Sequence, residues 1–135
     1  MIRTIGLLSA ALWWGSLSTI GFVVVPLLFA RMQSKQMAGQ IAALVFQYQA
    51  YVSWACAGVL IFIAFAQARK SNKLFKLGEN SLLLVGLAFS LCVYFIVAPQ
   101  ISARQNLKLW HSIGTALFAG QWICATVVLW RQNKT

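Results

Sequence analysis

The chain has 135 residues, of which 61% are hydrophobic and only 9% are charged. A soluble domain usually carries about 25% charged residues, so this composition excludes an ordinary soluble domain and requires an apolar solvent such as a lipid bilayer. Eleven lysines and arginines accompany a single acid, Glu79, and give a formal net charge of +10. The basic residues sit at the ends of apolar runs, which argues against nucleic acid and indicates contact with anionic lipid head groups.

Charged residues divide the sequence into four long uncharged windows. The windows are 4–30, 36–68, 80–103 and 109–130. Each is long enough to cross a ~30 Å hydrocarbon core, which takes about 20 helical residues, and none shows the alternation of a barrel strand. We therefore expect an all-α integral membrane four-helix bundle that forms a single domain over residues 1–135. The expected helices are approximately 4–29, 40–67, 80–99 and 109–130.

The first two windows need a comment on their starts. The N-terminal window is too long for the apolar core of a signal peptide and has no convincing cleavage site, so we expect a retained helix. The second window is longer than one crossing requires. We expect Ser34 to be the N-cap of a short helical turn that precedes the span.

Basic residues are unevenly divided between the two sides of the membrane. The N-terminus, the middle loop and the C-terminus carry seven: Arg3, Arg69, Lys70, Lys73, Lys76, Arg131 and Lys134. The other side carries four: Arg31, Lys35, Arg104 and Lys108. The positive-inside rule then predicts a protein of the cell (inner) membrane with both termini in the cytoplasm.

A short motif occurs twice. Pro26 is followed by Arg31, and Pro99, 73 residues later, is followed by Arg104 at the same spacing. An even number of crossings separates the copies, so a duplication would produce two parallel-repeat helical hairpins. The alternative is coincidence, because proline and arginine are common at the ends of membrane helices.

Small residues recur at helical spacing and predict close contacts between helices. The predicted packing residues are Ala11, Gly15 and Thr19 in the first helix, Gly86 and Ser90 in the third, and Ser112, Ala116, Gly120 and Cys124 in the fourth. The same residues would serve equally well within one bundle or between copies in a homo-oligomer.

Two groups of side chains are candidates for chemistry. His111, the only histidine, is a candidate haem or metal ligand or proton acceptor, or else an interfacial side chain bonded to Gln47 or Tyr94. Cys56, Cys92 and Cys124 lie inside apolar runs, where three thiols could bind a soft ion such as copper or simply pack as small core residues. We predict no cofactor and keep haem or copper as the alternative.

No catalytic triad, phosphate-binding loop, paired carboxylates or zinc motif occurs, so the chain carries no sign of an enzyme. The predicted role is that of a non-enzymatic membrane protein acting through helix packing, as a homo-oligomer or as an accessory subunit of a larger membrane complex. The alternative is a metal- or haem-binding redox protein that uses His111. A third hypothesis is a passive small-solute pore lined by glutamine and serine.

Several short motifs, in order along the chain, resemble the family of small four-span membrane proteins catalogued as DUF4149, which includes the transmembrane protein 205-like proteins. The residues that carry the resemblance are Gly15, Pro26, Phe29, Gly39, Phe46, Tyr48, Pro99 (which closes the third helix) and His111. The resemblance implies a four-helix membrane protein without an established biochemical activity.

Overall fold

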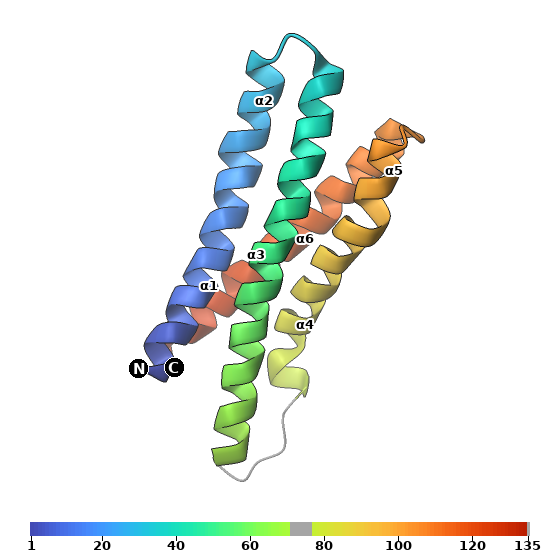
Figure 1. Cartoon of the computed structure of the whole chain (residues 1–135). Helices are drawn as coiled ribbons and strands as arrows, with labels where there is room; N and C mark the ends of the chain where they lie inside the picture. The colour runs from blue at the N-terminus through green and yellow to red at the C-terminus, as the bar shows by residue number, and fades with distance from the viewer. Residues whose placement is uncertain (71–76, 135) are drawn as a thin grey trace.

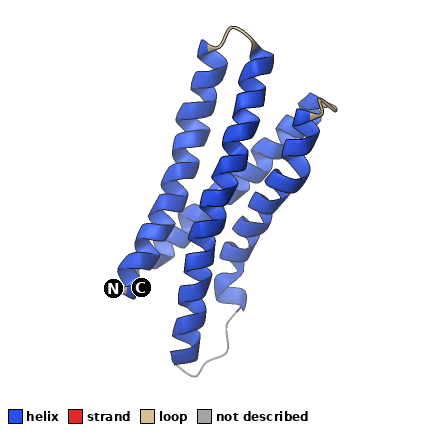
Figure 2. Cartoon of the chain, in the orientation of Figure 1, coloured by secondary structure: helices blue, strands red, loops and turns tan. Residues whose placement is uncertain are grey.

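The computed structural model of the chain describes residues 1–70 and 77–134, with side chains described from residue 80 in the second range. The expectations for Lys73, Lys76 and the Glu79 side chain therefore lie outside the described residues. Four long helical rods run side by side, and no strand occurs among the described residues (Figures 1 and 2). Their elements are α1 (Ile2–Thr19), η1 (Ile20–Val24) and α2 (Val25–Arg31); α3 (Lys35–Lys70); α4 (Leu77–Cys92), η2 (Val93–Val97) and α5 (Ala98–Ser102); and α6 (Leu107–Lys134).

All four rods are long and apolar enough to cross a membrane, which confirms the expected all-α four-helix architecture of an integral membrane protein. Each rod contains its predicted span and continues past it at both ends, because the aliphatic stems of lysine and arginine let a helix run into the head-group region. Ser34 caps the second rod as predicted, with its Oγ 3.3 Å from the backbone nitrogen of Met37. The short turn expected there belongs to α3 itself, which is continuous over 36 residues.

The rods form a ring in which each helix packs against two others. α1 lies between α3 and α6, and α4 lies between the same two helices on the other side. The N-terminus and the C-terminus therefore lie together at one end of the bundle, and the turns after α2 and α5 lie at the other (Figure 1). We call this second end the turn end.

The first and third rods share an irregularity at equivalent positions. Each contains a five-residue π-helical turn, η1 and η2, directly before its proline segment. The defining hydrogen bonds, Val25 N–H to Ile20 O and Ala98 N–H to Val93 O, are 73 residues apart, the spacing of the Pro26 and Pro99 motifs. A wider turn makes room for the proline ring, which would otherwise clash with the preceding turn of an α-helix. The duplicated motif is thus a duplicated backbone geometry.

The sequence resemblance implied that Pro99 ends the third helix. The structure shows that the helix continues past it. The π-turn accommodates Pro99 in the first turn of α5, and the helix continues to Ser102. The rod closes beyond that point: Arg104 N–H bonds to Ile101 O at 3.1 Å, and Gln105 N–H bonds to Gln100 O at 3.1 Å. These two bonds form a Schellman motif around Arg104, which adopts the left-handed conformation with φ 56°.

A buried hydrophobic cluster lies between the middle of the bundle and the end that holds the termini. Trp13 is fully buried there and packs onto Gly86, where a Cβ would come within 2.8 Å of the indole ring. The buried cluster consists of Ala10, Trp13, Leu17, Cys56, Leu60, Leu83, Ala125 and Val128. A large indole on a glycine therefore fixes the distance between α1 and α4.

Candidate functional site

A cavity opens at the turn end of the bundle, between the first turns of α3, the end of α5 and the start of α6. Its volume is about 350 Å³. Its walls are formed by Lys35, Gln36, Gly39, Gln40, Ile101, Arg104, Leu107 and His111. Polar and basic side chains thus come from α3, from the segment after α5 and from α6 to one opening at the turn end.

The charge around this opening is positive. Lys35 Nζ donates to the backbone carbonyl of Phe29, which fixes the ammonium group beside the last turn of α2. Arg104 lines the cavity from the opposite side. Glu79, the single acid of the sequence, lies in the first turn of α4, at the other end of the third rod. The opening is therefore suited to an anion.

The backbone at Arg104 reinforces this interpretation. The left-handed position of a Schellman motif is usually glycine, because a side chain there costs roughly 1–2 kcal/mol. Arginine occupies it here, with φ 56°, and Asn106 follows with φ 36°. Backbone strain of this kind is concentrated at functional sites, where the surrounding structure maintains it.

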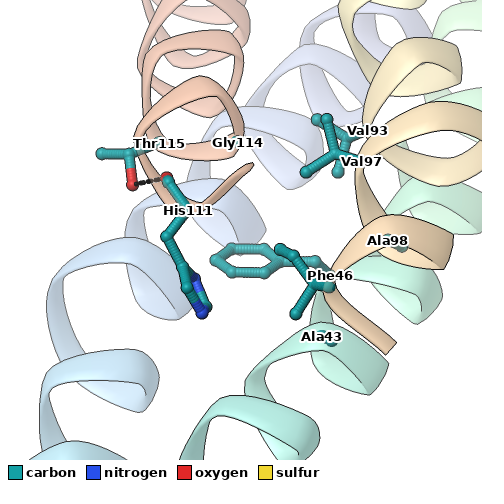
Figure 3. Close-up of a pocket in the computed structure, with 9 residues that line it drawn as sticks. Ala43, Phe46, Val93, Val97, Ala98, His111, Gly114 and Thr115 are labelled. Atoms are coloured by element: carbon teal, nitrogen blue, oxygen red, sulfur yellow. Dashed lines mark hydrogen bonds between the residues drawn. The ribbon is translucent and has the colours of Figure 1, made fainter. Parts of the chain in front are cut away.

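A second, apolar pocket of about 40 Å³ lies directly below the opening and shares Ile101 and His111 with it. Its other lining residues are Ala43, Phe46, Val93, Val97, Ala98, Gly114 and Thr115. Figure 3 shows the rings of His111 and Phe46 projecting into this space from α6 and α3. The Thr115 hydroxyl is turned away, to the carbonyl of His111 at 2.8 Å.

His111 lies one turn inside α6 and is exposed. Among the described residues, its ring forms no hydrogen bond with Gln47 or Tyr94, the two partners weighed from the sequence. The Tyr94 hydroxyl lies 2.7 Å from that of Tyr51 instead. The imidazole lies beside α3, since a Cβ on Gly39 would lie 3.9 Å from Nε2.

The residues of the family motif fall into two groups. Phe29, Gly39, Phe46 and His111 converge at the turn end: a Cβ on Gly39 would lie about 4.0 Å from both the Phe29 and the His111 rings, and Phe46 shares a pocket with His111. The other four do not take part. Gly15 has no atom within 4 Å of its Cβ position, Tyr48 is 70% exposed, and Pro26 and Pro99 are exposed beside the π-turns.

The cysteines do not form a metal site in this structure. Within residues 1–70 and 80–134, no three histidine, cysteine or acidic side chains come close enough to hold an ion. Cys56 and Cys124 are buried in the helix core, and Cys92 is half-buried at the end of α4. The three thiols are distributed between helix contacts, as small core residues are.

The predicted packing residues are also divided. Gly86 and Gly120 lie against aromatic rings, with Cβ positions 2.8 Å from Trp13 and 2.7 Å from Phe89, and Ser90 and Cys124 are buried. Ser112, Ala116 and Thr19 are exposed, and Ala11 and Gly15 are half-buried. The strip of the third helix therefore packs within the bundle, the strip of the fourth is divided between the interior and the surface, and no residue of the first-helix strip is buried.

Sequence reasoning did not find Lys35 and Arg104 as members of one site. In the sequence they are two of several charges that set the orientation and contact lipid head groups. One signal in the sequence could have identified them. Both lie on the side of the membrane where the positive-inside rule predicts few basic residues. Their convergence depends on the packing of α3 beside α5, which no local pattern encodes.

Fold and cavity define a small integral membrane protein with a cavity at one end of its helix bundle. The chain matches the family described as a domain of unknown function, DUF4149, over residues 8–109. It belongs to that family. His111 lies just beyond the matched region. No curated protein and no solved structure matches the chain.

Proposed function

We propose that the protein is a non-enzymatic membrane protein that binds an anionic amphiphile, with the anionic head in the cavity at the turn end. The observation that carries the proposal is the convergence of Lys35, Arg104 and His111 around one opening above an apolar pocket. Guanidinium and ammonium groups suit phosphate or carboxylate oxygens. Phe46 and Ile101 offer an apolar surface to the adjoining hydrocarbon.

The expected orientation strengthens this proposal. With both termini in the cytoplasm of a cell with an inner membrane, the cavity faces the opposite side, where basic residues are disfavoured near membrane helices. Two of the four basic residues at that end line the cavity, and one of them occupies a strained backbone position. Such residues are more consistent with ligand binding than with topology alone.

The test is a lipid titration of the full chain, purified in an uncharged detergent, followed by native mass spectrometry. Phosphatidylglycerol should bind with a defined stoichiometry, whereas phosphatidylcholine and inorganic phosphate should bind much more weakly. Arg104→Gly should weaken binding about tenfold or more, because a charge-assisted hydrogen bond contributes ~1.5–3 kcal/mol. The same change removes the backbone strain, so the variant should stay folded.

Lys70→Gln is the matched control, because Lys70 is a basic residue at the end of a helix outside the cavity. Equal losses for Arg104→Gly and Lys70→Gln would show that lipid responds to net charge and would overturn the proposal. Inorganic phosphate binding as tightly as phosphatidylglycerol would assign the site to a soluble anion instead.

Assembly is a second candidate function, as a homo-oligomer or as an accessory subunit. The observation that favours it is a lipid-facing aromatic patch on α3 and η2, made of Tyr48, Tyr51, Trp54, Tyr94 and Phe95. Tyr51 lies near the middle of α3 and is 48% exposed, although tyrosine normally sits at membrane interfaces. Native mass spectra that contain only monomer, with no co-purifying chain, would exclude this role.

Haem or copper at His111 remains the alternative to amphiphile binding. A single imidazole at the turn end offers one ligand, and such centres usually take more. The check is the iron and copper content per polypeptide of protein purified from its own membrane. A near-stoichiometric content that is lost in His111→Ala would favour the redox alternative.

A further inference from the structure

A layer of neutral polar side chains crosses the bundle halfway between its ends. Gln49 Nε2 donates to Ser16 Oγ at 2.9 Å, and Gln121 Nε2 donates to Ser53 Oγ at 2.8 Å. Gln49, Ser53 and Gln121 are buried. The layer links α1, α3 and α6 where the bilayer is most apolar, so each of its polar groups needs a partner.

Ser90 belongs to this layer but has no partner among the described residues. It is 1% exposed, and its hydroxyl oxygen is buried. Other hydroxyls in the helices donate to a carbonyl one turn back: Ser16, Ser18, Thr19, Ser53, Ser112, Thr115 and Thr126. Ser90 does not form this bond, which indicates that its hydroxyl bonds to another donor or acceptor.

Ser90 also lines a small cavity. Its volume is about 10 Å³, and its lining residues are Phe46, Gln49, Ala50, Ser90, Val93, Phe118 and Gln121. A site needs roughly 10–15 Å³ and two to four polar partners to hold one water molecule. One hydroxyl and two carboxamides meet this requirement, and the absence of charge among the lining residues disfavours an ion.

The small cavity at Ser90 is the innermost of three cavities that follow one another from the turn end. It shares Phe46 and Val93 with the apolar pocket, and that pocket shares Ile101 and His111 with the opening. On its other side lies the cluster around Trp13 and Leu60, both almost fully buried. The three cavities therefore lie on the turn-end side of this cluster.

We propose that Ser90, Gln49 and Gln121 form a hydrated site at the middle of the membrane, occupied by one water molecule that enters past His111. The route is half of a channel, and the core around Trp13 closes it. A passive small-solute pore, the third hypothesis from the sequence, would therefore reach only to the middle of the membrane. This proposal is independent of lipid binding, because it rests on the buried hydroxyl and not on the basic residues.

The first test is whether Ser90→Ala raises or lowers the thermal midpoint of unfolding. In a hydrated site, Ser90→Ala removes a partner of the water and should lower the thermal midpoint of the full chain in detergent. In a dry site, the same change removes an unsatisfied hydroxyl and should raise the midpoint. Ser112→Ala, which removes an exposed hydroxyl bonded within its own helix, is the control and should leave the midpoint unchanged.

The second test is water-edited solid-state NMR of serine-labelled protein in lipid, with the Ser90 signal identified from its loss in Ser90→Ala. Rapid transfer from water to Ser90 is expected. Gly114→Ala should slow it, because the added Cβ would lie 3.1 Å from Val97 and narrow the apolar pocket. A raised midpoint in Ser90→Ala or no transfer to Ser90 would overturn the hydrated site, and equal transfer in Gly114→Ala would overturn the entry route.

Discussion

Gly86 shows how a single residue determines helix spacing in this protein. Its missing side chain is replaced by the indole of Trp13, and a Cβ there would lie 2.8 Å from the ring and 3.3 Å from the Cβ of Cys124. Since lipid gives helices little hydrophobic reason to associate, such contacts provide much of the stability. The sequence placed Gly86 in a packing strip but did not identify Trp13 as its partner.

Gly86→Ala should destabilise the bundle by about 1–3 kcal/mol, because neither the indole nor the α6 backbone can move without repacking. Thermal unfolding in detergent measures the change. Gly15→Ala is the control, since no atom from another described helix lies within 4 Å of its Cβ position and alanine favours a helix. A loss in Gly15→Ala as large as in Gly86→Ala would indicate that Gly15 faces another chain.

Two half-buried indoles differ in their hydrogen bonding. Trp122 Nε1 donates to Ser18 Oγ at 2.8 Å, whereas Trp14 Nε1 has no partner among the described residues. Trp122→Phe should therefore lose about 0.6 kcal/mol, the average for such bonds in membrane bundles, beyond the packing change. Trp14→Phe removes an unpaired donor and should cost less. Equal unfolding midpoints for the two variants would show that the Ser18 bond contributes nothing.

At the scale of the helix, the two π-turns determine the direction in which the first and third rods continue toward the turn end. Pro26 and Pro99 supply no N–H, and the wider turns before them let both rods continue. Only the second copy leads into the cavity wall, through Ile101 and Arg104. The two motifs therefore have equivalent geometry, and only the second contributes to the cavity.

Pro99→Ala should weaken phosphatidylglycerol binding about tenfold, a change of ~1.4 kcal/mol, because a regular α-turn would rotate α5 and shift Ile101 and Arg104. Pro26→Ala makes the same change in the equivalent turn, but α2 contributes no lining residue and reaches the cavity only through the Phe29 carbonyl that accepts from Lys35. Binding should therefore weaken less in Pro26→Ala than in Pro99→Ala. The lipid titration compares the two variants directly, and equal binding would show that the π-turn does not position the site.

For the whole molecule, four crossings place the termini on one side and the turns after α2 and α5 on the other. Gln33→Cys and Gln105→Cys, made in a chain without its three native cysteines, should react with an impermeant maleimide added outside intact cells. Asn133→Cys should react only after the cells are opened. Reaction of Asn133→Cys alone from outside would reverse the proposed orientation and place the cavity at the cytoplasmic face.

The sequence by itself determined the number of helices, their approximate spans, the Ser34 cap, the repeated proline motif and the family. These features depend on local properties: the length of an apolar run, the identity of a capping side chain and the order of short motifs. It also identified His111 and Gly86 as residues of interest. It could not supply their surroundings.

Tertiary structure alone decided which helices touch, and thereby where the chemistry lies. It brought Lys35, Arg104 and His111 to one opening, separated the three cysteines, and left Ser90 facing a small cavity. It also let the third helix continue through Pro99. The physical reason is that helices in lipid associate through steric fit between residues far apart in sequence. The hydropathy of a segment does not depend on that fit and cannot predict it.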